Sequence, residues 1–576
     1  MLLALGHRKM DYPSIESWVD RALRLLATPL EPNTRVSIVN NTVHYFLLTG
    51  KYVKAEQIID LLKPSSSAAR TDSKETIALV AHLAISTFYY CYVGKHAKCI
   101  EIVNKGLEIA KSTGFILLNN IIAGHGIWSA LIEEEYAIAK ALFEKNVGSI
   151  GKVGLLDQGL IDFVKSLESL GMGNQAQAAA YAESALKASL EVGSQFSMIF
   201  CHLLNARVLY ETGEQQTANK HLNKAIQLSQ QTRSKHLMFH ALMLKARFAL
   251  DQDHAETGLQ VLREALELGK EIGLFHNMIE SRANVARICA VALEHGVEIN
   301  YVTTYIRKRD LTPNTLPITV EHWPWPIKVF TLGHFSIFKD GAPIRFSTKA
   351  QKKPLELIKA LIALGGHEVS KDHLSDALWP DAEGDKADRA LITTIHRLRR
   401  LLGNDRAIQV QGGKLELNPS YCWVDCWAFE RLLFMAEDAS KLQNMDAEIS
   451  LTEKALAVYK GAFLAGEMLE SWAVSPREHL RSRFLRAVNR MASILLSIRQ
   501  WDKAVDYYQR SLDVDDLSEE TYQRLMHCLQ QLGRTTEALS VYERCKKTLY
   551  AAFGLPPSSK TQAIRRSLLD RSLKSQ

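Results

Sequence analysis

Residues 385–402 read Asp385-Lys-Ala-Asp-Arg-Ala-Leu-Ile-Thr-Thr-Ile-His-Arg-Leu-Arg-Arg-Leu-Leu402, and the architecture of the chain can be worked out from this segment. At 100° per residue one side carries an apolar stripe at i, i+4, i+7 and i+11. The pattern predicts an amphipathic helix with its apolar side buried. The stripe consists of Leu391, Ile395, Leu398 and Leu402, and the opposite side carries Lys386, Arg389, Thr393, His396, Arg397 and Arg400.

The basic side of this helix suits a phosphate backbone. From Lys386 to Leu402 there are five Lys or Arg and one acid, Asp388, which leaves a net charge of +4 over roughly 25 Å of helix. An Arg-rich helix face is also typical of a plain solvated surface. The interpretation as a DNA-recognition helix therefore depends on the neighbouring segments.

The neighbouring segments predict a small sheet, two further helices and a hairpin. Strand patterns precede the basic helix, with Asp340-Gly341 as a hairpin turn, and a flexible basic tip, Gly412-Gly413-Lys414, lies in the hairpin that follows. A sheet, three helices and a hairpin form a winged helix. The expected strands are 327–332, 335–338, 344–346, 408–410 and 415–417, and the expected helices are 351–364, ending at Gly365-Gly366, and 371–378, capped by Ser370.

Residues 323–425 resemble the OmpR/PhoB-type winged helix of the Streptomyces antibiotic regulatory protein (SARP) family of transcription activators. The match rests on the entry segment Trp323–Gly333, on Leu378-Trp-Pro-Asp381 and on His396-Arg-Leu-Arg-Arg-Leu-Leu-Gly403. Relatives often have a small hydroxyl residue near the position of His396. The resemblance therefore leaves the base preference open.

The segment that follows resembles the bacterial transcriptional activation domain of the same family. The matching residues are Tyr459-Lys-Gly-Ala-Phe-Leu464, Trp472, Arg477-Glu478 and Gly554-Leu-Pro-Pro-Ser-Ser-Lys-Thr561. Together the two matches cover roughly residues 323–570. The resemblance implies a chain that binds repeated promoter elements, recruits RNA polymerase, and assembles on DNA with help from its C-terminal helical domain.

Internal repeats organise the rest of the chain. A small residue recurs five positions after each of a series of turns, and successive turns lie 39 to 44 residues apart. Helical hairpins of this length bury their apolar faces only by stacking on their neighbours, as in tetratricopeptide-like (TPR-like) solenoids. The pairs are Gly50/Ala55, Gly94/Cys99, Glu134/Ala139, Gly173/Ala178, Gly213/Ala218 and Asp253/Gly258, and then Arg499/Ala504 and Gly533/Ala538, which are 34 residues apart.

The predicted fold class is mainly α, with a central α+β domain. We expect a TPR-like helical array over residues 1–306 and a Pro-rich linker over 307–326. An OmpR/PhoB-like winged helix over 327–424 and a TPR-like activation domain over 425–576 follow. Trp323 and Trp325 in the linker either dock the array against the winged helix or pack on the adjacent sheet.

Composition indicates a multidomain protein of the cytoplasm. The 576 residues exceed the size of a single core, and 47% hydrophobic with 23% charged residues is ordinary for globular chains. Eight cysteines form no secreted disulfide pattern, and neither a signal peptide nor a membrane span is expected. The net charge is +7, of which residues 327–420 contribute +4. We expect a bacterial cytoplasmic protein that joins the nucleoid when bound to DNA.

The basic helix should enter the major groove with its N-terminal turns nearest the bases. Arg389, Thr393 and His396 are the candidates for base readout, and Lys386 belongs to the same face. Arg397 and Arg400 are expected to pair with phosphates. Lys414 at the hairpin tip either reaches the neighbouring groove or is merely solvated.

Enzymatic motifs are absent from the sequence. Each Gly-Lys pair lacks the glycine five positions earlier that a nucleotide-binding loop requires. Cys422 and Cys426 are separated by three residues and have no second cysteine pair nearby, so we interpret them as buried thiols and not as a zinc site. We expect no catalytic, metal or cofactor site.

The preferred function is a sequence-specific, DNA-binding transcriptional activator on double-stranded promoter DNA. One alternative is a non-enzymatic TPR scaffold whose winged helix docks protein, and another is a regulator driven by an ATPase module on a separate chain. The N-terminal array is either passive or a concave surface that receives a protein or small-molecule effector. Oligomerisation on DNA is a further expectation.

Overall fold

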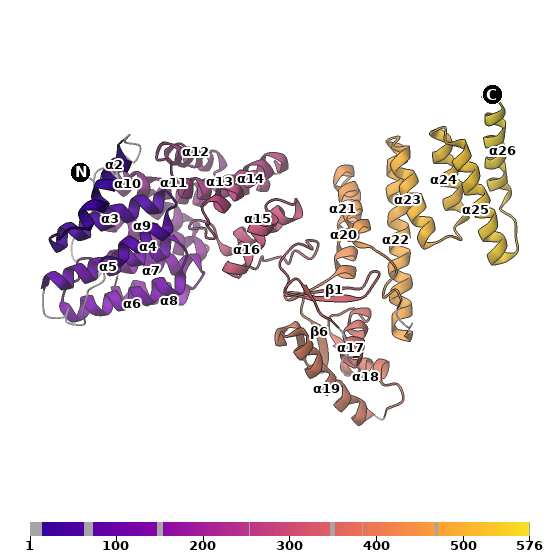
Figure 1. Ribbon diagram of the computed structural model, residues 1–576, viewed down its shortest axis with the longest axis horizontal. Helices are drawn as coiled ribbons and strands as arrows, with labels where there is room; N and C mark the ends of the chain where they lie inside the picture. The colour runs from indigo at the N-terminus through magenta and orange to yellow at the C-terminus, as the bar shows by residue number, and fades with distance from the viewer. Residues whose placement is uncertain are drawn as a thin grey trace. The chain divides into compact units, whose positions relative to one another are not determined.

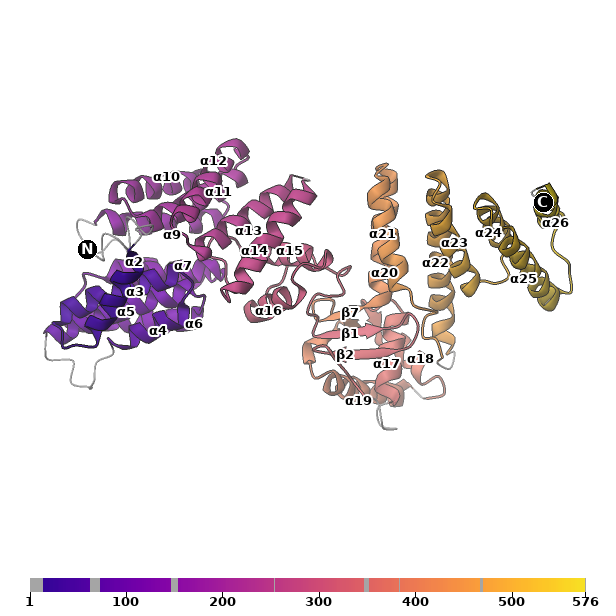
Figure 2. The same cartoon turned by 45° about the horizontal axis from the view of Figure 1, so that its top comes forward.

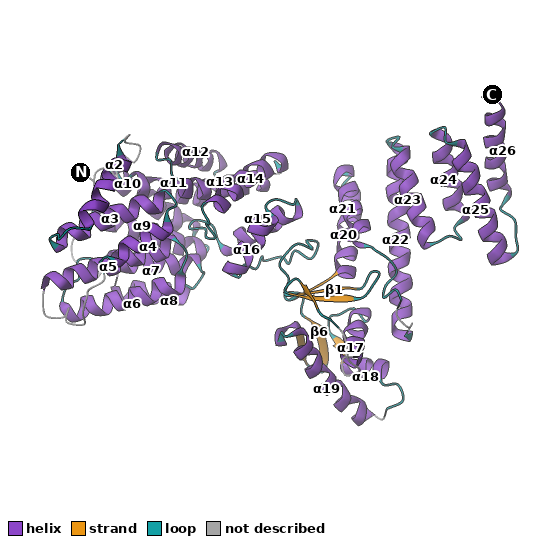
Figure 3. Cartoon of the chain, in the orientation of Figure 1, coloured by secondary structure: helices purple, strands orange, loops and turns teal. Residues whose placement is uncertain are grey.

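The chain divides into two compact units, Met1–Thr315 and Leu316–Gln576 (Figure 1). The computed structural model describes residues 14–62, 73–146, 154–252, 254–345, 352–382, 384–466 and 470–574. Helices make up almost all of the first unit and most of the second, which also contains two small sheets (Figure 3). The mainly α fold with a central α+β part is confirmed.

The N-terminal unit is an α-solenoid of antiparallel helix pairs. Each pair packs on the next, so that the core runs continuously through the stack. After a leading helix α2 (Ile15–Leu26), the helices are α3 (Pro32–Leu48), α4 (Tyr52–Asp60), α5 (Ser73–Tyr92), α6 (His96–Thr113), α7 (Asn119–Ile132), α8 (Tyr136–Asn146), α9 (Leu155–Gly171), α10 (Gln175–Val192), α11 (Gln195–Glu211), α12 (Gln215–Gln231), α13 (Lys235–Asp251), α14 (Ala255–Glu271), α15 (Arg282–Glu294) and α16 (Ile299–Arg309).

The predicted repeat turns lie between the two helices of each pair. The turn residue has a positive φ at Gly50, Gly94, Glu134, Gly173 and Gly213. The small residue five positions later is buried in every case, because the paired helices approach closely there: Ala55, Cys99, Ala139, Ala178 and Ala218 are all fully buried. Asp253 lies outside the described residues. Its partner Gly258 is buried, and a Cβ there would lie 2.8 Å from the Leu250 side chain.

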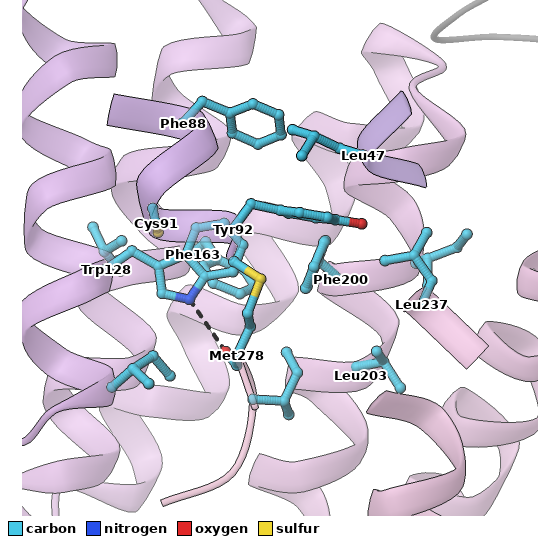
Figure 4. Close-up of a cluster of buried hydrophobic side chains, with 14 of the residues drawn as sticks. Leu47, Phe88, Cys91, Tyr92, Trp128, Phe163, Phe200, Leu203, Leu237 and Met278 are labelled. Atoms are coloured by element: carbon cyan, nitrogen blue, oxygen red, sulfur yellow. Dashed lines mark hydrogen bonds between the residues drawn. The ribbon is translucent and has the colours of Figure 1, made fainter. Parts of the chain in front are cut away.

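The solenoid closes on itself through contacts between residues far apart in sequence. Helix α13 packs against α3, the Ser234 hydroxyl donates to the Leu48 carbonyl at 2.9 Å, and the Tyr52 hydroxyl lies 2.7 Å from Nδ1 of His236. We call these contacts the clasp. The Trp128 indole also donates to the Met278 carbonyl at 3.2 Å, within the aromatic core shown in Figure 4.

The second unit begins with a winged helix. Strands β1 (Ile327–Phe330), β2 (Ser336–Lys339), β3 (Ala342–Pro343) and β7 (Cys422–Val424) form one sheet in the order β3-β2-β1-β7, in which β1 and β7 are parallel. A second sheet has the order β4-β6-β5. Its strands are β4 (Val369–Ser370), β5 (Ile408–Gln411) and β6 (Lys414–Leu417), and the helices are α17 (Lys352–Ala363), α18 (Lys371–Leu378) and α19 (Gly384–Leu402).

The two predicted hairpin turns are both present. Asp340 and Gly341 between β2 and β3, and Gly412 and Gly413 between β5 and β6, all have positive φ, as a two-residue type I′ turn requires. The strand predicted over 344–346 is shorter and earlier, at β3, and Phe346 lies outside the described residues. Ser370 occupies the N-cap of α18, but its side chain makes no capping bond.

The segment before β1 folds onto the sheet. Helix α16 runs to Arg309, into the start of the stretch predicted as a linker, and no helix is found from there to β1 among the described residues. Trp323 and Trp325 are buried, and the Trp325 indole donates to the Val320 carbonyl. The Trp423 indole of β7 donates to the Ile318 carbonyl at 2.7 Å and holds this segment against the sheet.

The C-terminal helices share one hydrophobic core with the winged helix. They form further antiparallel pairs, and the turn residues Arg499 and Gly533 have positive φ, with Ala504 and Ala538 fully buried after them, as predicted. The helices are α20 (Asp425–Lys441), α21 (Met445–Val458), α22 (Ser471–Ser497), α23 (Trp501–Val514), α24 (Glu519–Gln531), α25 (Thr535–Phe553) and α26 (Ser559–Lys574).

A junction joins β1 to the first C-terminal helices. The buried Asp425 carboxylate accepts the backbone N–H groups of Thr331 and Leu332 at 2.8 Å and the Thr331 hydroxyl at 2.6 Å. The Leu464 N–H donates to the Thr331 carbonyl at 2.7 Å. Gly333 and Gly461 pack so closely that a Cβ on Gly461 would lie 3.2 Å from Cα of Gly333. We call these contacts the junction.

Candidate nucleic-acid interface

Helix α19 presents the predicted basic face to solvent. Its 19 residues extend roughly 28 Å, and its apolar stripe packs against α17 and α18. The four stripe residues are between 0% and 4% exposed, as predicted. Figures 1 and 2 both show α19 on the side of its unit away from α20 and α21. The whole face is therefore accessible within this unit, and its exposed side chains are Lys386, Arg389, Thr393, His396, Arg397 and Arg400.

Three arginines of this face make no ion pair with any residue that the structure describes: Arg389, Arg397 and Arg400. The helix contains two acids: Asp385 lies in its first turn, and Asp388 lies beside α18, where the Ser375 hydroxyl is 3.4 Å from its carboxylate. The positive charge of the exposed face is thus not neutralised within the described part of the chain. Such a face is prepared to pair with an external anion.

The fifth basic residue of the helix has a structural role. The Arg399 guanidinium is half-buried and donates to the Ile408 carbonyl at the start of β5, at 2.8 Å. This bond ties the C-terminal turn of α19 to the hairpin. It sets the direction of the hairpin relative to the helix and removes one of the five cations from the exposed face.

Thr393 and the neighbouring Ile392 add uncharged groups, a hydroxyl and methyl groups, to this face. The Thr393 hydroxyl donates to the Arg389 carbonyl at 2.9 Å, which leaves its oxygen as an acceptor and its methyl group exposed. Ile392 is 50% exposed, although it is apolar. Sequence reasoning missed Ile392 because it looked for charge, and the available signal was an isoleucine off the buried stripe. A methyl group here suits contact with a thymine methyl.

Lys414 at the hairpin is already paired. Its ammonium lies 2.7 Å from the Glu368 carboxylate, and both side chains are more than half exposed. The nearby ammonium lowers the pKa of Glu368. Exposed pairs of this kind contribute little to stability.

The C-terminal helices match a known protein domain. Residues 424–569 match the model of the bacterial transcriptional activator domain. The winged helix directly precedes this match and shares its core.

The C-terminal unit is similar to SARP-type regulators, and we call it the SARP-type unit.

Two curated relatives are similar over a larger share of the chain than the family model. The regulatory protein AfsR of Streptomyces coelicolor is 25% identical over 238 residues, which are 41% of this chain and 24% of that protein. AfsR of Streptomyces griseus is 24% identical over 229 residues, 40% of this chain and 23% of that protein. The chain thus spans about a quarter of the length of the curated relatives it matches.

Among solved structures, the Mycobacterium tuberculosis protein EmbR, in complex with a low-affinity phosphopeptide, is similar to part of the chain. It has 18% sequence identity and a TM-score of 0.35, and the similarity covers 43% of this chain and 66% of EmbR.

The motif residues of the SARP-type unit lie at structural positions. The Arg477 guanidinium donates to the carbonyls of Phe463 and Leu464 at 2.8 and 2.7 Å, beside the junction. The Glu519 carboxylate accepts the Ser558 N–H at 2.7 Å and the Thr561 hydroxyl, which anchors the segment before α26. The motif thus reflects how the helices are held together.

The described part of the chain contains no group of three or more His, Cys, Asp or Glu that could hold a metal ion. Cys422 and Cys426 are buried, and burial raises the pKa of both thiols. No described helix is both long and apolar enough to cross a membrane.

Proposed function

We propose that the chain is a transcriptional activator that binds promoter DNA through α19. The supporting observation is that three arginines of an exposed helix face have no internal partner in the described residues. Burying the opposite stripe fixes the direction of the face, so that binding does not require ordering of the helix. The SARP-type setting of the winged helix supports the same assignment.

The face divides into two parts with different roles. Arg389, Thr393 and His396, with Lys386, lie in the N-terminal and central turns and face the base edges. Arg397 and Arg400 lie toward the C-terminus and pair with phosphates, which set the register of the protein on the duplex. Lys414 reaches the backbone beside the helix after leaving Glu368.

Removing Arg397 and Arg400 together should weaken binding to all duplexes alike. Each lost phosphate contact releases about 0.9 fewer counterions, so the slope of log affinity against log salt should become shallower by about 1.8. Fluorescence anisotropy with selected and random duplexes between 50 and 200 mM salt measures this change.

A matched control is Lys546→Ala with Lys547→Ala. This pair removes the same charge from the exposed side of α25 and should leave the slope unchanged. Equal slopes for the wild type and the Arg397→Ala/Arg400→Ala variant would contradict the phosphate role. They would favour a winged helix that docks protein.

Replacing Arg389 with alanine should instead reduce sequence discrimination. A bidentate contact to guanine contributes about 1–3 kcal/mol against the wrong base, roughly a 5- to 150-fold preference. Duplexes are first selected from a randomised pool with the wild-type chain, and the ratio of selected to random affinity is then measured for Arg389→Ala. A lower affinity for both duplexes with an unchanged ratio would reassign Arg389 to a phosphate contact.

The remaining partners follow from the SARP-type resemblance. We propose that α20–α26 contact RNA polymerase, that copies of the chain assemble on repeated elements, and that the N-terminal array receives an effector. Transcription in vitro with purified polymerase tests recruitment: the full chain should raise transcript yield from a template bearing the selected site, and Arg397→Ala/Arg400→Ala should not. If that variant still activates transcription, the contact with polymerase does not require binding of DNA through Arg397 and Arg400.

A further inference from the structure

The N-terminal unit contains a cavity of about 580 Å³. Its walls come from the first helices of five successive pairs, α3, α5, α7, α9 and α11, and from α10. The volume falls within the roughly 300–1,000 Å³ that is typical of small-molecule sites. A ligand here would touch most of the first half of the solenoid at once.

Aromatic rings build the walls. The ring centroids of Phe88 and Phe196 lie 5.7 Å apart and those of Phe196 and Phe200 5.0 Å apart, in edge-to-face arrangements. Trp128 meets Phe163 at 4.7 Å and Phe200 at 5.0 Å. Figure 4 shows Phe88, Trp128, Phe163 and Phe200 converging from different helices. Edges and faces of this kind suit flat, apolar rings.

The described residues that line the cavity include no Lys, Arg, Asp or Glu. A carboxylate, phosphate or ammonium entering it would lose its hydration without gaining a counter-charge, which is strongly unfavourable. The Ser189 hydroxyl already donates to the Leu186 carbonyl, and the Ser197 hydroxyl donates to the Ser194 hydroxyl oxygen. The walls therefore offer few partners for the many amide groups of a peptide.

One lining side chain, His125, has a free hydrogen-bonding atom. The Thr87 hydroxyl donates its proton to the Ala84 carbonyl at 2.8 Å, so at 3.2 Å it must accept from Nδ1–H of His125. Burial lowers the pKa of His125 to about 3, which keeps the ring neutral. Nε2 then carries a lone pair, and no residue in the described part of the chain donates a hydrogen bond to it.

We propose that this cavity binds an uncharged, largely apolar small molecule with aromatic character, and that a hydroxyl or N–H group of that molecule donates to Nε2 of His125. This inference deepens the sensing role proposed for the N-terminal array. It does not depend on DNA binding, because the cavity lies wholly within the first unit.

Three fluorescent probes test the ligand chemistry on the full chain. N-phenyl-1-naphthylamine is neutral and aromatic and has one N–H donor, its N-methyl derivative lacks the donor, and 8-anilino-1-naphthalenesulfonate carries a charge. We expect saturable binding of the first probe at one per chain. The N-methyl probe should bind about fivefold more weakly, for the loss of one hydrogen bond, and the sulfonate at least tenfold more weakly.

Two variants locate the probe. Ser197→Trp at the partly exposed wall should fill the cavity and weaken binding of the first probe at least tenfold. His125→Phe keeps the ring packed on Phe88 and removes the acceptor. It should therefore weaken the N–H probe about fivefold and leave the N-methyl probe unchanged. His295→Phe, at an exposed position on the C-terminal side of α15, is the matched control.

The comparison of the two probes separates the acceptor role from a loss of folding. Equal weakening of both probes by His125→Phe would overturn the acceptor role, because a merely structural defect acts on both. The absence of saturable binding, or equal affinity for the sulfonate, would overturn the proposed ligand class. The proposed function is tested separately, because the affinity of the chain for duplex DNA is measured without any probe.

Discussion

Lowering the pH from 7.5 to 5 should unfold the N-terminal array while the SARP-type unit remains folded. The cause is a set of buried histidines in the solenoid. Burial lowers the pKa of His125 to about 3 and that of His276 to about 4, and it lowers the pKa values of His236 and His240 strongly. Neither ring nitrogen of His240 has a hydrogen-bond partner among the described residues.

The direction of the pH effect follows from where the protons bind. In the unfolded chain a histidine takes up a proton below about pH 6.5, whereas these four stay neutral when folded. The unfolded state therefore binds more protons, and the free energy of unfolding falls as the pH falls from about 6.5 toward the folded pKa values. The stability that these groups retain above pH 6.5 is lost on acidification.

The expected loss is large. At pH 5 each histidine is 1.5 pH units below its unfolded pKa, which costs about 2 kcal/mol per group and about 8 kcal/mol for four. That sum matches the whole stability of many domains, about 5–15 kcal/mol. In the second unit, burial raises the pKa of Asp425 to about 6, so protonation between pH 7 and 5 should stabilise that unit by about 1 kcal/mol.

Scanning calorimetry and far-UV circular dichroism of the full chain at pH 7.5, 6.5, 5.5 and 5.0 measure the effect. We expect two transitions, of which only the one belonging to the array moves to lower temperature in acid. His240→Leu should lower the pH at which the array unfolds, since it removes one titrating group, and His295→Leu at an exposed position should not. An array transition that does not move between pH 7.5 and 5.0 would refute the prediction.

Asp425→Ala should destabilise the SARP-type unit by about 3 kcal/mol. Its carboxylate accepts the N–H groups of Thr331, Leu332 and Cys426 and the Thr331 hydroxyl, all at 2.6–2.8 Å. An unpaired buried donor costs about 1–3 kcal/mol. The raised pKa of Asp425 shows that burying its charge is itself unfavourable, and relief of that cost offsets part of the loss.

Urea unfolding of the full chain measures this change in the transition of the SARP-type unit. Asp516→Ala removes an exposed carboxylate from the loop after α23 and should change the free energy of unfolding by less than 0.5 kcal/mol. Asp425→Asn keeps one acceptor oxygen, so its loss in free energy of unfolding should lie between those of Asp425→Ala and Asp516→Ala. Asp425→Ala with the stability of the wild type would show that the junction does not hold the winged helix to α20.

Much of the fold could be predicted because its patterns are local. The stripe of α19, the Asp340-Gly341 and Gly412-Gly413 turns, and the small residues after each repeat turn all follow from rules acting within a few residues. The clasp was not predicted, because Tyr52 and His236 are 184 positions apart and nothing local relates them. The same holds for the bond from Asp425 to Thr331.

The exposure of the candidate interface was predictable, but the partners of its side chains were not. Helical periodicity separates Leu398 from Arg397 and places the second in solvent. It does not show that Arg399 reaches the Ile408 carbonyl or that Lys414 meets Glu368, because both bonds depend on how the hairpin folds back. The roles assigned to individual residues in reading DNA remain proposals.

The clasp gives the array a fixed number of repeats. An open solenoid can gain or lose a helix pair at little cost, since each pair meets only its neighbours. Here Ser234 and His236 contact Leu48 and Tyr52, so the rotations between successive helix pairs must add up to bring α13 back beside α3. Deletion or duplication of a single pair would bring the ends out of phase, and for this reason the array should evolve by substitution within its repeats rather than by changes in their number.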